Sequence, residues 1–329
     1  MACSSTPPWY TPREQHAPAP CIFTLTPYIA QSYHDRGVYF AAHGLPFLTI
    51  DVRGRGSSQG EFHPFIQEAR DGYDIVEWLA QQPYCNGKVS MWGGSYAGYD
   101  QWATAKEFPP HLATIVPVAS PYAGVDFPMQ YNIFFRTTCS GLPSPAAAPH
   151  RTGSLATRSS GNRPIAAGSS RAGPSRTSTS CSAILTDLPG MARPSASRHI
   201  GTPTIRLPSN TPGSPSRFSP SPAAMTTISR EPSPIYREYM KSASPEARAR
   251  HYLVIGPWDH AGTRTPKAEF GGLTFGEASL VDLPKLHVDW YGWTMQGGAK
   301  PAFLAEGCRL LRDGRRSLAL FRYARGRYV

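Results

Sequence analysis

Short apolar segments alternate with amphipathic ones along the first part of the chain. Residues 21–26 and 47–54 are apolar runs of strand length, and residues 34–43 between them are compatible with a helix. In residues 65–82 the apolar side chains recur at helical spacing. They are Ile66, Ala69, Tyr73, Val76, Leu79 and Ala80. The pattern therefore predicts a series of alternating strands and helices.

This alternation continues to residue 120 and resumes at about residue 235. Residues 89–92 favour a buried strand, a helix-compatible stretch follows to about residue 107, and residues 115–120 favour the next strand. Later, residues 236–249 have a helical pattern, and residues 251–260 favour a strand that ends in a loop. Such an order predicts an α/β fold with a mostly parallel sheet, whose functional site lies at the carboxyl ends of the strands.

Residues 137–234 break the pattern. They contain ten Arg, no Lys, two acidic residues, fifteen of the 34 prolines and no Tyr or Trp. Because so few large apolar side chains cannot form a core, this composition predicts disorder. Residues 305–329 are also basic, with seven Arg and two acidic residues. The two stretches account for the formal net charge of +11, and the rest of the chain is not basic.

The remaining composition favours a globular protein. With 329 residues, 40% of them apolar, the chain is long enough for one large α/β domain or two smaller ones. Neither a leader peptide nor an apolar run of membrane-spanning length is visible, which favours a cytoplasmic location and no membrane partner. The six cysteines lack CxxC spacing, which predicts reduced thiols.

The sequence Gly93-Gly94-Ser95-Tyr96-Ala97-Gly98 separates the predicted strand 89–92 from the following helix. A serine between small residues at a strand-to-helix turn is typical of a nucleophile elbow, which exposes the hydroxyl above the sheet. The general pattern G-x-S-x-G requires glycine at position 97, where this chain has alanine. A serine between glycines is more often an ordinary turn, but the flanking strand and helix make Ser95 the candidate nucleophile.

A serine nucleophile needs a base within hydrogen-bond reach. Among the ten histidines, His260 is the candidate, because it follows a late strand on a loop, where α/β hydrolases carry their catalytic histidine. A loop histidine by itself is more often structural. We interpret His251, before that strand, and His287, within a helical pattern, as packing or surface residues.

Several motifs occur together and in order. Pro27-Tyr28 follows the first strand, DVRGRGSSQGEF contains the end of the second, and GPWDH contains His260. With the elbow, they resemble the cocaine-esterase-like (CocE/NonD) hydrolases, a family that includes X-Pro dipeptidyl-peptidases and α-amino acid ester hydrolases. The elbow of that family is G-x-S-Y-x-G, which this chain matches. The resemblance covers about residues 11–136 and 235–304.

The resemblance implies an α/β-hydrolase fold and a serine hydrolase that cleaves a small ester or peptide through an acyl-enzyme. Ser95 would attack the carbonyl carbon, and His260 would accept its proton and return it to the leaving group. The Tyr96 backbone N–H and the Tyr28 hydroxyl would hold the oxyanion. Without the family, a buried aromatic residue at a strand end is an equally good interpretation of Tyr28. We expect Asp51 and Arg53 to fix a loop rather than to react.

The third catalytic group has no clear candidate. The acid of the family follows a later strand in a Gly-aromatic/Tyr-Asp context, but Asp187 and Glu231 are the only acidic residues in 137–234, and neither has that context. Asp259 adjoins the histidine, and we expect its carboxylate to point elsewhere. The triad acid is therefore unknown.

We interpret the unusual stretches as segments translated in the wrong reading frame. Abundant Arg, Pro, Ser and Ala without Lys is the composition that off-frame reading of GC-rich DNA produces. Residues 219–234 can be re-read in a neighbouring frame as LTITGRYDDDQPGALT, a strand followed by the missing acid motif, which lies across Met225 and Thr226. The chain would then lack its acid strand, its cap and a C-terminal β-sandwich that begins near residue 305, and its activity would be impaired.

The expected organisation is the N-terminal half of a hydrolase core at 11–136, a low-complexity segment at 137–234, the remainder of the core with the histidine at 235–304, and a frame-shifted β-sandwich start at 305–329. The alternative is a non-catalytic binding protein with a degenerate hydrolase core and an Arg-rich disordered insert for a polyanion. The hydrolase interpretation expects no nucleic acid. We find no metal or cofactor motif, and the oligomeric state stays open.

Overall fold

The computed structural model describes residues 8–15, 17–127, 129–130, 133–134, 223–228, 234–304 and 308–310. The chain divides into two units, one made of Met1–Phe127 with Pro203–Val329 and the other of Pro128–Thr202. Within the second unit, the described residues form a short antiparallel pair, β6 (Met129–Gln130) and β7 (Ile133–Phe134).

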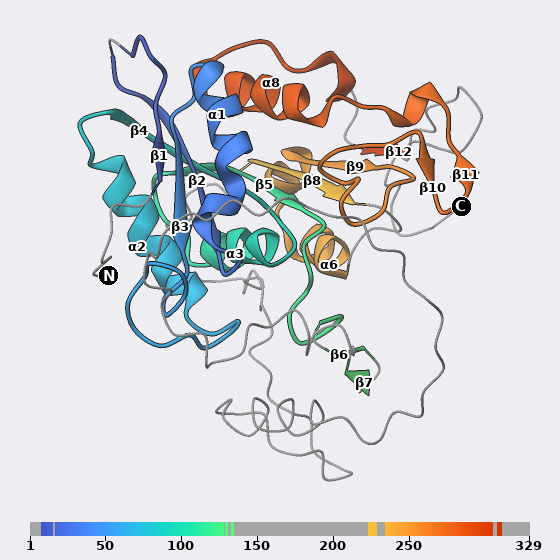
Figure 1. The fold of residues 1–329 in the computed structure, drawn as a ribbon, viewed down its shortest axis with the longest axis horizontal. Coiled ribbons are helices and arrows are strands. Elements are labelled where there is room, and N and C mark those ends of the chain that lie inside the picture. The colour runs from blue at the N-terminus through green and yellow to red at the C-terminus, as the bar shows by residue number, and fades with distance from the viewer. Residues whose placement is uncertain are drawn as a thin grey trace, which may run out of the picture. The chain divides into compact units, whose positions relative to one another are not determined.

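An eight-stranded sheet organises the first unit (Figure 1). Its order is β1-β3-β2-β4-β5-β8-β9-β12, and only the pairing of β1 with β3 is antiparallel. The predicted α/β fold with a mostly parallel sheet is therefore confirmed. The strands are β1 (Trp9–Tyr10), β2 (Ala19–Thr26), β3 (Phe47–Asp51), β4 (Cys85–Gly94), β5 (Leu112–Val118), β8 (Ala223–Ile228), β9 (His251–Ile255) and β12 (Cys308–Leu310).

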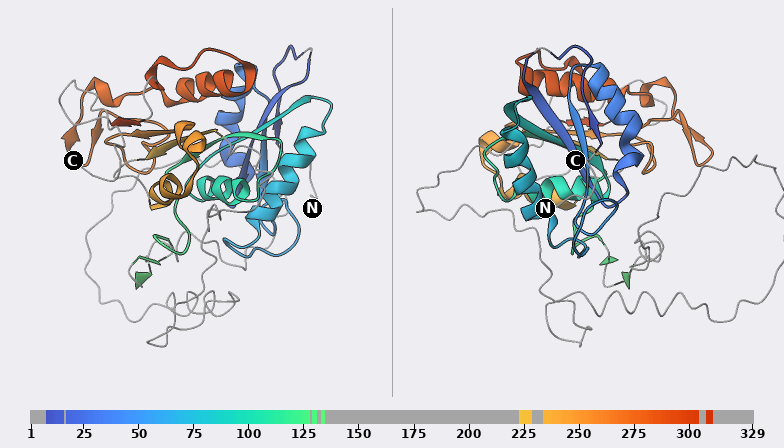
Figure 2. Two further views of the ribbon diagram at one scale, coloured as in Figure 1. Left: turned by 180° about the vertical axis from the view of Figure 1, so that it is seen from behind. Right: turned by 60° about the vertical axis from the view of Figure 1, so that its left-hand side comes forward.

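Helices cover both faces of this sheet, which lies between two helical layers in each view (Figure 2). One face packs against α2 (Glu68–Ala80), α3 (Tyr96–Ala105), α6 (Pro234–Ser242) and α7 (Pro245–Ala249). The other packs against α1 (His34–Ala42) and α8 (Leu283–Gln296). Shorter elements are the 3₁₀ turns η1 (Ala30–Tyr33), η2 (Glu277–Ser279) and η3 (Ala302–Leu304), and the pair β10 (Glu269–Phe270) and β11 (Leu273–Thr274).

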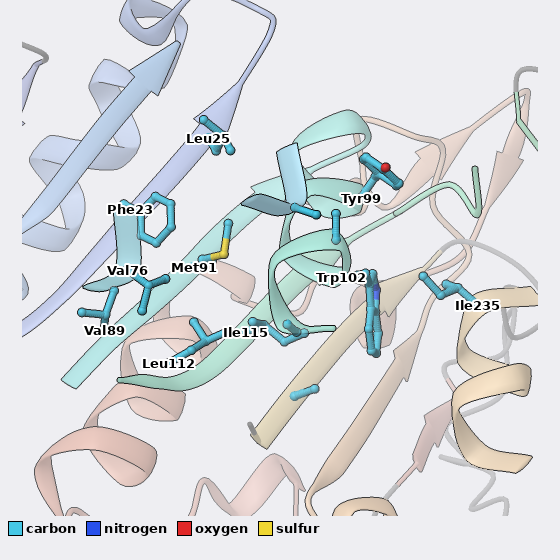
Figure 3. Packing of buried hydrophobic residues seen from close by; sticks show 14 of the residues in the cluster. Phe23, Leu25, Val76, Val89, Met91, Tyr99, Trp102, Leu112, Ile115 and Ile235 are labelled. Atoms are coloured by element: carbon cyan, nitrogen blue, oxygen red, sulfur yellow. The ribbon is translucent and has the colours of Figure 1, made fainter. Parts of the chain in front are cut away.

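The strands are buried on both faces, which explains why their sequences are apolar runs rather than alternating patterns. Along β2, Cys21, Phe23 and Leu25 belong to the core under α2 and α3, whereas Ile22 belongs to the core under α1 and α8. Successive side chains thus pack into the cores on opposite faces of the sheet, as the geometry of a strand requires. Figure 3 shows how Phe23, Met91 and Val76 come together from three elements of the first core.

Strand β8 is the main departure from expectation. We expected the sheet to lack an interior strand here, but residues 223–228 lie between β5 and β9 and are all buried. Alanine is small enough for this crowded position, and β-branched Thr and Ile suit a strand. Thr114 Oγ1 also donates a hydrogen bond to the Ala223 carbonyl oxygen at 2.7 Å. The expectation of a missing strand is therefore wrong. The strand itself contains no acidic residue, so Met225 and Thr226 do not supply the triad acid.

Two helix boundaries also differ from the pattern. Helix α2 begins at Glu68, so Ile66 precedes it and is 44% exposed, while Ile75 joins the core instead. The helical segment 236–249 is divided into α6 and α7, because Ser244 caps the second helix through its hydroxyl and Pro245 occupies its first turn. The other predicted elements of residues 21–120 and 251–260 are present.

Several predictions concern residues outside the described parts of the chain. Most of 137–234, with Asp187 and Glu231, and most of 305–329 lie there, although Cys308–Leu310 pairs in parallel with β9 as an edge strand. The interpretation of these stretches as frame-shifted, the low-complexity assignment and the four segment boundaries stay predictions.

The position of β8 predicts a large effect of Met225→Asp. The Met225 side chain is fully buried, so the substitution removes apolar packing and places a carboxyl group in an apolar core. We expect the free energy of unfolding to fall by about 3 kcal/mol or more, as measured by urea denaturation followed by circular dichroism. The control Leu273→Asp alters a side chain that is 63% exposed, and we expect a change within about 0.5 kcal/mol. Equal effects of the two substitutions would contradict the placement of β8.

Candidate active site

Ser95 lies on a strained turn between β4 and α3. Its backbone has φ 61° and ψ −122°, in the left-handed range that a residue with a Cβ atom seldom adopts. Two sets of hydrogen bonds hold the turn. The Ser95 N–H donates to the Val118 carbonyl at 2.8 Å, and the Ser95 carbonyl accepts from the N–H groups of Gly98 and Tyr99 at 2.9 and 3.1 Å. The serine is therefore fixed to β5 on one side and to α3 on the other.

Two glycines make this turn possible because other groups approach them closely. A Cβ atom on Gly93 would lie 2.7 Å from the Cβ of Ala97, and one on Gly98 would lie 3.0 Å from the Cβ of Ser120. The second glycine is thus needed at position 98, where the helix passes the end of β5. Position 97 faces Gly93 and accepts alanine. The local packing therefore accounts for the departure from G-x-S-x-G.

The Tyr28 hydroxyl lies beside the serine. It donates to Ser95 Oγ at 3.2 Å and accepts from the Tyr96 backbone N–H at 3.4 Å. The two tyrosine rings meet edge to face, with their centroids 6.4 Å apart. The Tyr28 side chain is 43% exposed, so the buried-aromatic interpretation of this residue is wrong. The three groups expected to attack the carbonyl and hold the oxyanion are therefore close together, at the N-terminus of α3.

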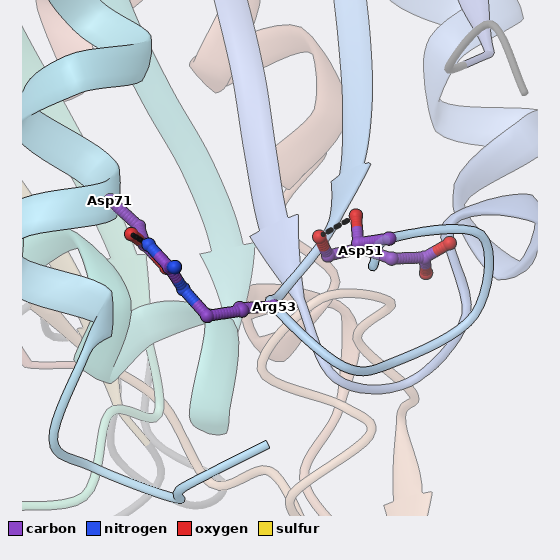
Figure 4. Close-up of polar contacts among 4 residues, drawn as sticks. Asp51, Arg53 and Asp71 are labelled. Carbon is purple, nitrogen blue, oxygen red and sulfur yellow. Dashed lines mark hydrogen bonds and ion pairs between the residues drawn. The ribbon is translucent and has the colours of Figure 1, made fainter. Parts of the chain in front are cut away.

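Asp51 lies at the end of β3 (Figure 4), and its carboxylate holds the loop that carries Tyr28. This carboxylate accepts from the Ala30 backbone N–H at 2.7 Å, and from the backbone N–H and hydroxyl of Ser57 at 2.9 and 3.1 Å. It thereby joins the loop after β2 to the loop after β3. Since Asp51 is buried and these donors occupy both its oxygens, it fixes the loop, as we expected.

Arg53 acts two residues further along. Its guanidinium forms a two-pronged ion pair with Asp71 of α2, in which Nε lies 3.1 Å from Oδ2 and Nη2 contacts Oδ1 (Figure 4). The planar fork of an arginine fits a carboxylate in this way. The pair connects the loop after β3 to the helix that covers the elbow, so Arg53 also has the loop-fixing role that we expected.

A buried polar group lies under Tyr96. The Tyr96 hydroxyl donates to Glu68 and accepts from the Phe65 backbone N–H at 2.7 Å. Glu68 is 2% exposed, and among the described residues its second oxygen, Oε2, has no partner. Burial raises the pKa of Glu68 and raises that of Tyr96 well above its usual range. These hydrogen bonds fix the Tyr96 side chain, and the backbone N–H of the same residue donates to the Tyr28 hydroxyl beside Ser95.

A second buried carboxyl group, Asp100, lies on α3. It is fully buried, and neither oxygen has a partner among the described residues. Burial raises its pKa well above the usual range, and the nearby Glu68 raises it further. Both carboxyl groups thus favour the neutral form under the elbow, which limits the cost of burying them.

The loop that carries His260 has a defined path. Trp258 is buried, packs so closely on Gly256 that a Cβ there would lie 2.3 Å from its ring, and donates from Nε1 to the Ser279 carbonyl at 2.9 Å. The Asp259 carboxylate accepts from the Gly262 N–H at 2.5 Å. Asp259 therefore stabilises its own loop. Its carboxylate is bonded to the Gly262 N–H and not to the His260 ring, as we expected.

Arg264 connects this loop to the elbow. Its Nη2 donates to the His260 carbonyl oxygen at 3.3 Å, and its Nη1 would lie 2.3 Å from a Cβ built on Gly94, the residue before Ser95. Among the described residues the Ser95 hydroxyl is bonded to Tyr28, and no hydrogen bond joins it to the His260 ring. The role of His260 as base stays a prediction.

The surroundings of His260 lower the pKa of its ring, although part of the residue is exposed to solvent. Partial loss of water is the largest cause, the positive charge of Arg264 adds to it, and the negative charge of Asp259 opposes it. The neutral imidazole, which can accept a proton, is therefore present at lower pH than for a free histidine.

In the described parts of the chain no carboxylate forms a hydrogen bond or ion pair with the His260 ring. Met225 and Thr226 are buried within β8, and the Thr226 hydroxyl is 2.8 Å from Nε2 of His251. His251 is thus a packing residue, and so is His287, whose Nδ1 accepts from Trp92 Nε1 at 3.1 Å. The triad acid stays unassigned.

Two residues of this neighbourhood were not predicted from the sequence. Glu68 looks like an ordinary acidic residue of a helix N-terminus, and Arg264 like a surface cation of a loop. A hint for Arg264 was the second glycine in Gly93-Gly94, because a glycine before the nucleophile leaves space for a side chain from elsewhere. The described residues hold no group of three or more His, Cys, Asp or Glu side chains that could bind a metal ion. None of the described helices has the length and apolarity to cross a membrane.

Comparison of the sequence with known families and proteins finds a family that matches the N-terminal part of the chain, and relatives that match shorter stretches. Residues 8–140 match the family described as X-Pro dipeptidyl-peptidase (S15 family). Over 78 residues the chain is 36% identical to the cocaine esterase of Rhodococcus sp. (strain MB1 Bresler), a match that covers 24% of this chain and 14% of the esterase.

Solved structures share the fold more widely. An aminopeptidase from a marine sediment Thaumarchaeota archaeon matches with a TM-score of 0.65 and 18% identity, over 94% of this chain and 55% of the other. An α-amino acid ester hydrolase matches with a TM-score of 0.64 and 18% identity, over 91% and 53%. A CocE/NonD family hydrolase from Staphylococcus aureus has a TM-score of 0.54 and 14% identity, over 92% and 50%.

These findings confirm the resemblance to the cocaine-esterase-like hydrolases and the α/β-hydrolase fold. The matched family is described as X-Pro dipeptidyl-peptidase and the relative named above is an esterase, and the structural likeness, at identities of 18% and below, shows the fold. The chain spans about half the length of the solved structures it matches, and its match to the esterase covers a much smaller share of that protein.

The charge of Arg264 predicts a shift in a pH profile. Because that charge lowers the pKa of His260, Arg264→Gln should raise it, so the imidazole becomes protonated at higher pH. If His260 is the base, the acid limb of the rate at which a fluorophosphonate labels Ser95 should move to higher pH. The control Lys267→Gln removes an exposed cation of the same loop and should leave the limb in place. An unmoved limb in Arg264→Gln would contradict the prediction.

Proposed function

We propose that the protein is a serine hydrolase that cleaves a small ester or peptide through an acyl-enzyme. The observation that carries the proposal is the position of the Tyr28 hydroxyl, within hydrogen-bond distance of both Ser95 Oγ and the Tyr96 backbone N–H. An ordinary turn would not require a partly exposed tyrosine hydroxyl beside the serine. The strained backbone of Ser95 supports the same conclusion, since strain of this kind concentrates at functional sites.

The proposed reaction begins with attack of Ser95 Oγ on the substrate carbonyl carbon while His260 accepts the serine proton. The negative oxygen of the tetrahedral intermediate is held by the Tyr96 N–H and the Tyr28 O–H. His260 returns the proton to the leaving alcohol or amine, which leaves an acyl group on Ser95. Water then attacks this ester while His260 takes its proton, the bond between Ser95 Oγ and the acyl carbon breaks, and His260 returns the proton to Ser95 Oγ as the acid product leaves.

Turnover is expected to be slow. Without a carboxylate that orients the histidine and stabilises its charged form, a triad of this kind loses about 10⁴ in kcat. In the described residues no such carboxylate contacts His260. The same observation favours the second candidate, a binding protein with a degenerate hydrolase core. Covalent labelling separates the two, because it requires a reactive serine and no turnover.

Labelling by a fluorophosphonate should therefore be detectable after long incubation and should disappear in Ser95→Ala. In this reaction a bond forms between Ser95 Oγ and phosphorus as fluoride leaves. Intact-protein mass spectrometry measures the added mass. Ser32→Ala, which removes an exposed hydroxyl near Tyr28, should be labelled like the parent protein. Equal labelling of the parent and Ser95→Ala would reject Ser95 as nucleophile, and no labelling of the parent would favour the binding protein.

Tyr28→Phe should slow the labelling of Ser95 by about a hundredfold, because one donor of the oxyanion site is lost. Since Tyr28 is 43% exposed, the free energy of unfolding of the protein should change by no more than about 0.5 kcal/mol. Thermal unfolding measures this change. Tyr73→Phe is the matched control, because among the described residues that hydroxyl has no hydrogen bond. If both variants label at the parent rate, the Tyr28 hydroxyl has no part in the reaction.

A further inference from the structure

A guanidinium group lies between the two parts of the candidate active site. Arg264 follows His260 on the same loop, and its Nη2 donates to the His260 carbonyl oxygen at 3.3 Å. A Cβ atom on Gly94 would lie 2.3 Å from Arg264 Nη1. The guanidinium therefore fills the space beside the residue that precedes Ser95, where the side chain of any other amino acid would stand.

Among the described residues, no carboxylate lies within ion-pair distance of this guanidinium. The ion pairs there involve other cations, such as Arg53 with Asp71. A guanidinium has five N–H donors, and the side-chain bond of Arg264 among the described residues is the one long contact to a carbonyl. Arg264 is half-buried, so it combines spare donors with access to solvent.

We propose that Arg264 binds a substrate carboxylate beside Ser95, so that the protein acts on esters or amides that carry a carboxylate close to the scissile bond. A planar guanidinium accepts a carboxylate through two parallel hydrogen bonds, an arrangement that fixes orientation as well as charge. The inference rests on the proposed hydrolase, because Ser95 defines where the scissile bond lies. It goes further in naming the charge of the substrate and the residue that selects it.

The competing explanation is that Arg264 only ties the histidine loop to the elbow. A tie of that kind would affect every ligand of the site equally, because it acts on the position of His260 and Ser95. A carboxylate receptor distinguishes a charged ligand from a neutral one of the same shape. Discrimination between two such ligands is therefore the measurement that separates the explanations.

Benzoate and benzamide are the probes, since they have nearly the same size and differ in charge. Each is tested for its ability to protect Ser95 from the fluorophosphonate. In the parent protein we expect benzoate to protect at about tenfold lower concentration than benzamide, the gain of a charged hydrogen-bonded pair. In Arg264→Gln the two should protect alike. Arg264→Lys, which keeps the charge without the fork, should show an intermediate ratio.

Lys267→Gln is the control, because it removes a neighbouring exposed cation and should keep the parent ratio. Circular dichroism verifies that each variant is folded. Equal protection by benzoate and benzamide in the parent, or an unchanged ratio in Arg264→Gln, overturns the assignment of Arg264. If the parent is not labelled at all, the proposed hydrolase fails. Calorimetric titration of the same proteins with benzoate then decides whether Arg264 binds a carboxylate.

Discussion

The strained turn at Ser95 is the constraint on which the described part of the molecule depends. A non-glycine residue with φ 61° costs about 1–3 kcal/mol and persists only where its surroundings leave no alternative. Here the end of β5 accepts the Ser95 N–H, α3 starts at the next residue, and Gly93 and Gly98 allow both elements to approach. The turn therefore connects β4, β5 and α3, and the two strands are neighbours in the middle of the sheet.

Three loops meet the turn at the carboxyl ends of parallel strands, and one side chain anchors each of them. Asp51 holds the loop of Tyr28, Glu68 holds the segment over Tyr96, and Trp258 holds the loop of His260. All three anchors are buried or nearly so. Because a buried polar group is costly unless it is bonded, each anchor favours one loop conformation over the others.

The electrostatics of the site are set by a cation rather than by an acid among the described residues. Partial burial and, after it, the charge of Arg264 lower the pKa of His260 and so favour its neutral form. The same charge, close to Gly94 and therefore to Ser95, favours negative charge that develops on a substrate. Beneath the elbow, burial raises the pKa values of Glu68 and Asp100. The site as described thus suits anionic species.

The sequence by itself determined the strands of residues 21–120 and 251–255, the elbow with Ser95, the loop with His260 and the resemblance to a hydrolase family, because these depend on apolar runs and on short motifs. It did not determine the acid, for which no motif exists, and it misjudged residues 223–228 because their composition hid a strand that only β5 and β9 stabilise. The tertiary structure decided between the two interpretations of Tyr28, whose hydroxyl reaches Ser95, and it alone placed Glu68 under Tyr96 and Arg264 beside Gly94. Those contacts join residues far apart in the chain, and their geometry arises only when the parallel sheet brings the strand ends together.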